Sequence, residues 1–257
     1  MNDTLKKKLR RKTVTIGSWI TIGHTAIAEI MAKAGFDWLA VDMEHSVITL
    51  HEAQQLIQVI ELTGVTPLVR VGENSPYIIK RVMDAGAHGV IVPMINTKED
   101  ARNAVNAVKY PPLGTRGVGL GRAQGYGMDF ERYKNRVNRN SVVIAQIEHI
   151  KAIENLEDIL STEGIDAFFV GPYDLSGSLG VPGQLKHPKV VKALGRVMKI
   201  AKRYKVVPGF HVVQPDVEGT EMKIKEGYKF IGYSLDTLFL GTKCTEDLRV
   251  IKRKVKK

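Results

Sequence analysis

Short apolar runs rich in β-branched residues recur along the whole chain, separated by polar segments with regularly spaced apolar residues. The runs predict strands that begin at Thr13, Trp38, Thr66, Gly89, Val142, Ala167, Val206 and Phe230. In the segments between them, such as residues 51–64 and 152–164, an apolar residue recurs every three or four positions, which predicts amphipathic helices. Thr49 and Glu52 have the spacing of a helix-starting capping box, and glycines such as Gly64 can end the helices.

Near-continuous apolar strands that alternate with helices are typical of a parallel sheet covered by helices, because parallel neighbours need a crossover connection. The eight repeats predict an α/β fold, a single (β/α)8 TIM barrel domain over residues 1–257. A doubly wound open sheet is the alternative. The long intervals from residue 89 to 142 and from 167 to 206 are expected to carry loops that form a site.

The composition is that of an ordinary soluble protein, with 44% of the 257 residues hydrophobic and 25% charged, which excludes disordered and collagen-like chains. Cys244 is the single cysteine, so an internal disulfide and a cysteine-rich zinc site are also excluded. No run approaches the roughly 18 consecutive apolar residues that a membrane helix needs. No targeting segment is recognised, and we expect a cytoplasmic enzyme with no membrane partner.

Lysine and arginine outnumber aspartate and glutamate by 38 to 27, which gives a net charge of +11. Much of the excess lies in residues 6–12 and in the C-terminal tail, residues 252–257. Such terminal runs are usually solvated, and we expect that here; attraction of acidic small substrates or nucleic acid is the alternative. Because no aromatic stacking residues are interleaved with these charges, no nucleic-acid partner is expected.

Ionisable and amide side chains stand where the predicted strands end. They are Asp42, Glu44 and His45 after the second strand, Arg70 at the end of the third, Gln146 and Glu148 on the fifth, and Asp174 after the sixth. The carboxyl ends of barrel strands meet on one rim, where barrel enzymes place their chemistry. Each residue alone has an ordinary structural explanation, but together they predict an active site.

Two of these carboxylates, Glu148 and Asp174, are expected at the tips of adjacent strands, close enough to share a cation. Two carboxylates completed by water and substrate oxygens suit Mg²⁺ or Mn²⁺ better than zinc. Beside such an ion, Arg70 is expected to bind a carboxylate or enolate oxygen. Asp42 or Glu44 is expected to orient His45 for proton transfer.

This combination suits enolate chemistry. A bound dication polarises the carbonyl of a keto acid and stabilises the enolate that forms when a neighbouring C–C bond breaks or a proton leaves. A lysine Schiff base is the alternative route to the same chemistry. The predicted sixth strand contains no lysine, and Lys205 and Lys229 lie at the entry ends of later strands, so the metal route is favoured.

Residues 114–127 are too rich in glycine to form a regular element, and they include Arg116 and Arg122. A passive surface loop and a loop that binds an anion through backbone N–H groups are both compatible with this composition. The segment lacks the features of a Walker A loop and of a dinucleotide fingerprint, and the chain contains no HExxH, CxxC or GxSxG motif.

Several segments together resemble the HpcH/HpaI aldolase family over nearly the whole chain. The most specific are FDWLAVDMEH at residues 36–45, QIE at 146–148 and GPYDLS at 171–176. The resemblance implies a TIM barrel of the phosphoenolpyruvate/pyruvate superfamily. It also implies an aldolase, dependent on Mg²⁺, Mn²⁺ or Co²⁺, that cleaves a 4-hydroxy-2-oxo acid to pyruvate and an aldehyde.

The resemblance also assigns roles to single residues. It implies that Glu148 and Asp174 are the metal ligands and that Arg70 holds the pyruvyl oxygens and stabilises the enolate. It implies that His45, supported by Asp42, is the acid/base and acts through metal-bound water. Further substrate contacts are implied for Gln146, Gly171, Pro172, Tyr173 and Asp174.

Members of this family are commonly hexamers, trimers of dimers in which the last helix, here residues 237–257, is exchanged between subunits. Asp84 matches a catalytic residue that a neighbouring subunit lends. Two positions depart from the family pattern: Tyr173 is bulky where many relatives have a small residue, and His211 stands where an aliphatic residue is frequent. The aldehyde side of the pocket is therefore expected to differ, with His211 either contacting a polar substrate or filling the rim.

Two alternatives to an aldolase stay open at this stage. One is a related carbon–carbon lyase of the citrate-lyase or acyl-CoA-lyase type, or a decarboxylase, although no nucleotide-binding surface for a CoA substrate is recognised. The other is a barrel without catalytic activity that binds anions through its basic surface.

Overall fold

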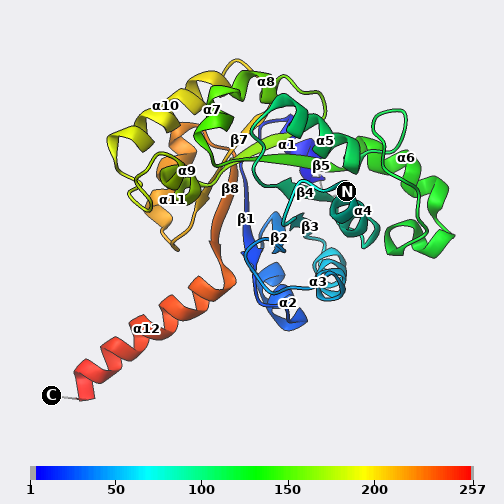
Figure 1. The fold of residues 1–257 in the computed structure, drawn as a ribbon. Coiled ribbons are helices and arrows are strands. Elements are labelled where there is room, and N and C mark those ends of the chain that lie inside the picture. Colours follow the sequence, from blue (N-terminus) through cyan, green and yellow to red (C-terminus); the bar gives the residue numbers. More distant parts are fainter. Residues whose placement is uncertain (1–3, 256–257) are drawn as a thin grey trace.

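Eight parallel strands close into a barrel in the computed structural model, which describes residues 4–255 (Figure 1). The strands are β1 (Thr15–Ile20), β2 (Trp38–Asp42), β3 (Thr66–Arg70), β4 (Gly89–Val92), β5 (Val142–Ile147), β6 (Ala167–Val170), β7 (Val207–Val212) and β8 (Phe230–Leu235). Each strand pairs with the next along the chain, and β8 pairs with β1. The predicted (β/α)8 barrel is confirmed, and the open sheet is excluded.

Helices precede, connect and follow the strands, and those between strands cover the outside of the barrel. They are α1 (Leu5–Arg10), α2 (Thr25–Lys33), α3 (Leu50–Leu62), α4 (Pro76–Asp84), α5 (Lys98–Val108), the 3-10 segment η1 (Arg122–Gly127), α6 (Phe130–Asn140), α7 (Ile150–Glu154), α8 (Leu156–Leu160), α9 (Pro172–Ser178), α10 (Pro188–Ala201), α11 (Val217–Glu226) and α12 (Asp236–Val255). The predicted capping box is present, because the hydroxyl of Thr49 accepts from the N–H of Glu52 and the Glu52 carboxylate accepts from the N–H of Thr49.

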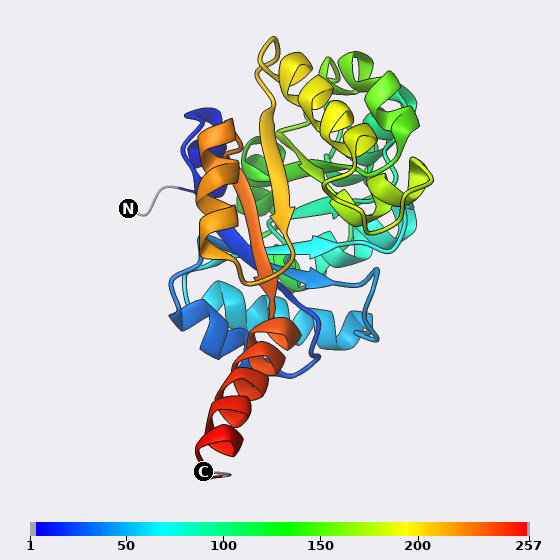
Figure 2. The same ribbon diagram turned by 90° about the vertical axis from the view of Figure 1, so that its left-hand side faces the viewer.

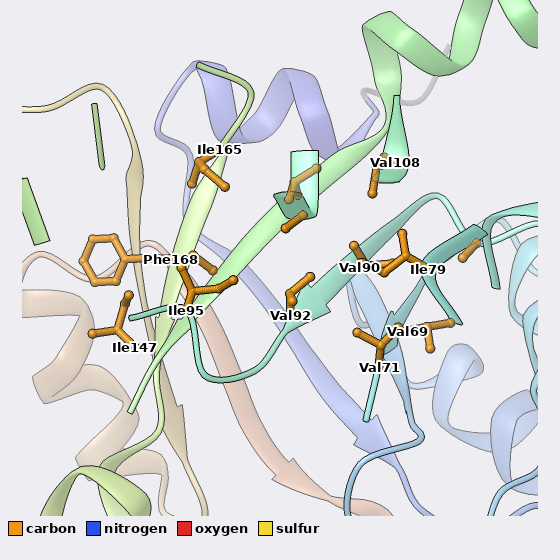
Figure 3. Packing of buried hydrophobic residues seen from close by; sticks show 14 of the residues in the cluster. Val69, Val71, Ile79, Val90, Val92, Ile95, Val108, Ile147, Ile165 and Phe168 are labelled. Carbon is orange, nitrogen blue, oxygen red and sulfur yellow. The ribbon is translucent and has the colours of Figure 1, made fainter. Parts of the chain in front are cut away.

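The side chains of each strand alternate between two apolar cores, as the two-residue period of a strand requires. In β2, Trp38 and Ala40 face the interior of the barrel, whereas Leu39 and Val41 face the surrounding helices. Figure 3 shows part of the outer core, where strand residues such as Val90 meet helix residues such as Ile79. This alternation decides which strand residues can reach the barrel mouth.

The amino end of the barrel is closed by α1, which the sequence pattern did not predict. Leu5 and Leu9 join the inner core. The ammonium group of Lys6 is buried, where it pairs with Asp166 and donates to the carbonyl of Ser141 at 3.0 Å. The expectation that residues 6–12 form a solvated run is therefore wrong for Lys6, because a local acceptor and a carboxylate offset the loss of its hydration.

The last helix, α12, projects away from the barrel (Figures 1 and 2). Apolar side chains on it are left exposed, among them Leu240, Leu248 and Ile251. Lys256 and Lys257 of the basic tail lie outside the described residues. No helix within residues 4–255 has both the length and the apolar character needed to cross a membrane.

Candidate active site

The inward-facing rows of the strands end in polar side chains at the carboxyl rim. Trp38 and Ala40 are followed in the same row by Asp42, and Val142 and Ile144 are followed by Gln146 and Glu148. Arg70 follows Leu68 in the same way. Since each row keeps its direction, these polar groups form the top layer of the barrel filling, and the predicted convergence on one rim is observed.

Arg70 and Asp42 form a bidentate ion pair in this layer. The distances are 3.0 Å from Nε to Oδ1 and 2.6 Å from Nη2 to Oδ2, and the guanidinium carbon lies 4.4 Å from the ring centre of Trp19. Burial acts to raise the pKa of Asp42, but the hydrogen bonds and charge of Arg70 outweigh it, and the net pKa is lowered. Asp42 is therefore an ionised carboxylate that fixes Arg70.

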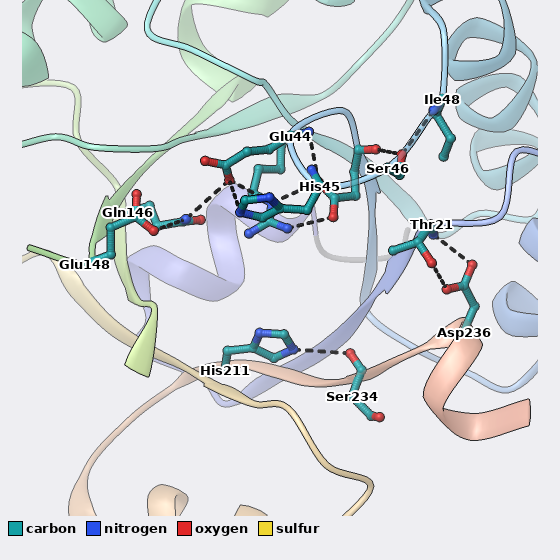
Figure 4. Close-up of polar contacts among 12 residues, drawn as sticks. Thr21, Glu44, His45, Ser46, Ile48, Gln146, Glu148, His211, Ser234 and Asp236 are labelled. Atoms are coloured by element: carbon teal, nitrogen blue, oxygen red, sulfur yellow. Dashed lines mark hydrogen bonds and ion pairs between the residues drawn. The ribbon is translucent and has the colours of Figure 1, made fainter. Parts of the chain in front are cut away.

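The turn after β2 is also organised by Asp42. Oδ1 of Asp42 accepts from the backbone N–H groups of Glu44 at 3.0 Å and His45 at 3.2 Å. The imidazole of His45 is 62% exposed, and its Nε2 lies 3.9 Å from Oε2 of Glu44 (Figure 4). The carboxylate nearest the imidazole is thus Glu44, while Asp42 supports His45 through the backbone.

Glu44 stands between the basic and acidic groups of the site. Its Oε2 lies 3.2 Å from Nε of Arg70 and 3.5 Å from the amide nitrogen of Gln146. Burial raises the pKa of Glu44; the charge of Arg70 opposes this, and that of Glu148 adds to the increase. The mouth of the barrel therefore concentrates negative charge, which Arg70 and, to a smaller extent, His45 offset.

Glu148 is held in place by two donors. Its Oε1 accepts from the backbone N–H of Met94 at 2.7 Å, and its Oε2 accepts a short hydrogen bond from the amide of Gln146. The carbonyl oxygen of the Gln146 side chain is buried and has no partner within residues 4–255. An orphaned acceptor at this position is available to a bound molecule or to water.

Asp174 meets Glu148 across Gly171. A Cβ atom on Gly171 would lie 3.2 Å from Oε2 of Glu148 and 3.8 Å from Oδ2 of Asp174, so both carboxylates converge on the same stretch of backbone. Pro172 begins α9 and is buried, which places Asp174 in the first turn of that helix, exposed at the rim. Tyr173 beside it is 43% exposed.

This pair of carboxylates fits a hard divalent cation, which prefers oxygen ligands and keeps positions open for water and substrate. Within the described part of the chain, no group of three or more His, Cys, Asp or Glu is arranged to hold a metal ion. Glu148 and Asp174, which converge at Gly171, are the side chains that could hold such an ion, with Gln146 fixing the orientation of Glu148.

His211 lies in the inner row of β7 and packs on the same aromatic floor as Arg70. Its ring centre is 5.4 Å from that of Trp19 and 5.9 Å from that of Phe169. Its Nε2 lies 3.4 Å from the carbonyl oxygen of Ser234 (Figure 4). The sequence predicts neither Trp19 nor Ser234 as a site residue. Trp19 lies in an apolar strand and is expected in the hydrophobic core, and Ser234 contributes its backbone carbonyl, which residue type does not indicate.

Asp84 does not join these residues within one chain. It ends α4, which runs back to the amino end of the barrel, and its Oδ1 accepts from Arg116 at 2.5 Å and from Gln124 at 2.9 Å. Both partners belong to the glycine-rich loop of residues 114–127. The other arginine of that loop, Arg122, pairs with Glu61 at 2.6 Å, so both guanidinium groups are already bound to carboxylates.

Comparison with known proteins gives the same assignment as the motifs. Residues 15–240 match the HpcH/HpaI aldolase/citrate lyase family. The chain is 35% identical over 254 residues to the 2-keto-3-deoxy-L-rhamnonate aldolase of Escherichia coli (strain K12), an alignment that covers 98% of this chain and 94% of that protein.

Solved structures of two relatives superpose on almost the whole chain. An HpcH/HpaI aldolase/citrate lyase family protein from Burkholderia cenocepacia J2315 has a TM-score of 0.92 and 34% identity, covering 96% of this chain and 98% of its own. An HpcH/HpaI aldolase from Desulfitobacterium hafniense DCB-2 has a TM-score of 0.90 and 34% identity, covering 98% and 97%. The chain therefore belongs to the HpcH/HpaI aldolase/citrate lyase family, and it is a carbon–carbon lyase.

Proposed function

We propose that the protein is a divalent-metal-dependent aldolase that cleaves a 4-hydroxy-2-oxo acid to pyruvate and an aldehyde. The observation that carries the proposal is the convergence of Glu148 and Asp174 at Gly171, on the same rim as a bidentately fixed Arg70. Mg²⁺ or Mn²⁺, with Co²⁺ as a further candidate, fits these oxygen donors. When bound, the ion supplies Lewis-acid polarisation of the keto group of the substrate.

Arg70 binds the pyruvyl half of the substrate. Asp42 occupies its Nε and Nη2, while Nη1 donates to no residue in the described part of the chain. A guanidinium fixed in this way can offer Nη1 to the carboxylate or keto oxygen without losing its own orientation. As the C–C bond breaks, its positive charge stabilises the negative charge that develops on the keto oxygen.

His45 moves the proton that the cleavage requires. The C4 hydroxyl of the substrate must lose a proton as the aldehyde forms. C3, which becomes the methylene carbon of the pyruvate enolate, must then gain a proton. The exposed imidazole of His45, beside Glu44, can accept and return a proton at this mouth. Gln146 and the backbone of residues 171–174 complete the seat of the pyruvyl group, and Tyr173 and His211 border its aldehyde side.

The relatives narrow the substrate class. A 2-keto-3-deoxy acid with a hydroxyl at C4, the class acted on by the rhamnonate aldolase of Escherichia coli, is a 4-hydroxy-2-oxo acid. Its retro-aldol cleavage gives pyruvate and a hydroxyaldehyde. We place the small-molecule substrate of this enzyme in that class. We expect the enzyme to act in the cytoplasm, with neither nucleic acid nor a membrane as partner.

The exposed apolar side chains of α12 support a homo-oligomer in which residues 237–257 pack on another subunit. A hexamer built as a trimer of dimers fits this arrangement. In such an assembly Asp84, distant from its own rim, would act at the site of a neighbour.

Pyruvate release from a panel of 4-hydroxy-2-oxo acids, followed by a coupled dehydrogenase, tests the proposal. Activity should disappear with a chelator and return with Mg²⁺, Mn²⁺ or Co²⁺. Asp174→Ala should abolish metal-dependent turnover, whereas Asp158→Ala, on the exposed surface of α8, should match the wild type. Pyruvate release that a chelator leaves unchanged, or full activity in Asp174→Ala, would refute the metal assignment.

A further inference from the structure

The ring of His211 is fixed by a backbone irregularity in β8. In the β1–β8 ladder Gly17 is opposite Gly232 but Trp19 is opposite Leu235, so Ser18 faces both Tyr233 and Ser234. Ser234 is the extra residue of this bulge and has a positive φ of 50°. Bulges of this kind re-aim backbone groups. The carbonyl of Ser234 here accepts from the hydroxyl of Ser18 at 3.2 Å and lies 3.4 Å from Nε2 of His211.

A carbonyl oxygen can only accept, so this contact requires the proton of the neutral imidazole to be on Nε2. Burial lowers the pKa of His211 to about 3, and the charge of Arg70 acts in the same direction, so the ring is neutral at physiological pH. In the neutral ring with Nε2 protonated, Nδ1 is a hydrogen-bond acceptor. No residue in the described range 4–255 donates to it.

The acceptor faces the substrate site. In Figure 4 the His211 ring lies across the barrel mouth from Glu44, His45 and Gln146, with Nε2 turned aside toward Ser234. Trp19 supports both Arg70 and His211, so the two residues flank one aromatic floor.

The chemistry of the two substrate halves decides which one this acceptor can serve. The carboxylate and keto oxygens of the pyruvyl half are acceptors and offer no proton to Nδ1. The hydroxyl groups of the aldehyde half are donors. An acceptor that cannot become a donor near neutral pH therefore distinguishes a hydroxyaldehyde from an aldehyde with a carboxylate or a bare alkyl chain.

We propose that Nδ1 of His211 accepts a hydrogen bond from a hydroxyl group next to the aldehyde carbon, and that the enzyme thereby selects hydroxyaldehydes. The inference rests on the proposed aldolase function and adds to it the substrate class of the aldehyde side. A site built to hold a substrate hydroxyl rejects the analogue that lacks it, because a buried polar group is then left unpaired.

The test is condensation of pyruvate with pairs of aldehydes that differ by this hydroxyl: glycolaldehyde against acetaldehyde, and lactaldehyde against propionaldehyde. The measured quantity is the ratio of kcat/KM within each pair, compared between wild type and variant, so that intrinsic aldehyde reactivity cancels. His211→Leu should lower this ratio roughly 10- to 100-fold, the range expected for one lost hydrogen bond at a desolvated site.

Two further variants separate the ring nitrogens. Asn places an amide oxygen near the position of Nδ1, so His211→Asn should keep most of the preference. Gln places its amide near Nε2, so His211→Gln can still donate to Ser234 but lacks the acceptor and should lose the preference. His51→Leu, at an exposed position of α3, is the control and should leave the ratio unchanged.

Equal losses for both members of a pair in His211→Leu and His211→Gln would overturn the inference and leave the aldolase function intact. The absence of condensation with any aldehyde in the wild type would instead overturn the aldolase function and the inference with it.

Discussion

Two arginines in this barrel make nearly the same contacts at opposite ends of it. Arg70 pairs with Asp42 and lies 4.4 Å from the ring centre of Trp19. Arg116 pairs with Asp84 and lies 4.7 Å from the ring centre of Tyr110. Each guanidinium thus pairs with a carboxylate and lies against an aromatic ring, a combination that suits arginine better than lysine, and Arg70 also lies 3.2 Å from a second carboxylate, that of Glu44.

The two arginines differ in which N–H groups remain available for a ligand. The side chain of Arg116 is fully buried, and its Nη1 donates to the hydroxyl of Tyr133 at 3.0 Å, so its charge is enclosed by protein. The side chain of Arg70 is 12% exposed, and Asp42 takes only Nε and Nη2. Its Nη1 donates to no residue within residues 4–255, and the same rim holds Glu148. A buried ion pair becomes a binding group when one donor is left toward a cavity.

The comparison predicts the largest effect on activity at Arg70. Arg70→Lys keeps a positive charge near Asp42 but removes the bidentate pair and the free Nη1. We expect kcat to fall about 10²- to 10³-fold, or about 3–4 kcal/mol in transition-state stabilisation, the scale of one lost oxyanion donor. Steady-state pyruvate release measures this. The far-ultraviolet circular dichroism spectrum should stay that of the wild type, and unchanged kcat would remove Arg70 from the mechanism.

The same logic predicts the largest effect on stability at Arg116. Arg116→Met removes the partner of Asp84 and Tyr133 and should lower the free energy of unfolding by about 3 kcal/mol, because a carboxylate loses its buried counter-charge. Denaturant unfolding of the full chain measures it, with Arg132→Met on the exposed face of α6 as the control. A loss of kcat with unchanged stability would contradict a purely structural role for Arg116 and would indicate that the Asp84 region acts in the chemistry of a neighbouring subunit.

Much of the candidate site could be predicted because a strand has a fixed period. Once β2 and β5 were recognised, the direction of Asp42 and of Glu148 followed from Trp38 and Val142 at even spacings along the same strands. The eight strands were predictable for the same reason, since a parallel barrel buries both faces of every strand.

The features that escaped prediction depend on contacts between distant segments. Lys6 is buried because Ser141, 135 residues away, supplies an acceptor, and nothing in the basic run itself indicates this. Of the two long intervals expected to form the site, the one after β6 does contribute Asp174. The interval after β4 contributes the backbone N–H of Met94, which donates to Glu148, but its loop of residues 114–127 lies at the amino end, because it follows α5, and the arginines of that loop bind Asp84 and Glu61.

A third carboxylate–guanidinium pair, Glu61 with Arg122, is more exposed than the other two and makes stability depend on pH. The hydrogen bond from His88 is the main cause that lowers the pKa of Glu61 to about 2; burial opposes it, and Arg122 adds to the decrease. A carboxylate whose pKa is lowered by folding stabilises the fold at pH values above its pKa in the unfolded chain, about 4.5. This stabilisation is lost as the pH falls toward 2, the pKa in the folded protein. Glu61→Gln should therefore cost about 1 kcal/mol at pH 7 after solvent screening.

Unfolding experiments at several pH values measure this difference. The difference in unfolding free energy between wild type and Glu61→Gln should narrow below about pH 4.5, where the carboxylate of the unfolded chain takes up a proton. Glu163→Gln, at an exposed loop position, provides the control. A difference in unfolding free energy that stays constant down to pH 3 would show that the negative charge of Glu61 does not stabilise the loop.

The smallest effect is expected for the aromatic floor of the site. Trp19→Leu keeps an apolar side chain inside the barrel but removes the π face under Arg70, a contact worth about 0.5–2 kcal/mol. Because Asp42 still fixes the guanidinium, KM for the pyruvyl substrate should rise several-fold while kcat changes little. Trp19 and Trp38 are the only tryptophans of the chain, so in Trp38→Phe the quenching of the remaining fluorescence by pyruvate reports directly on this floor. A larger fall in kcat than rise in KM for Trp19→Leu would mean that the cation–π contact acts in the transition state, and the distinction between a positioning ring and a reacting guanidinium would then no longer hold.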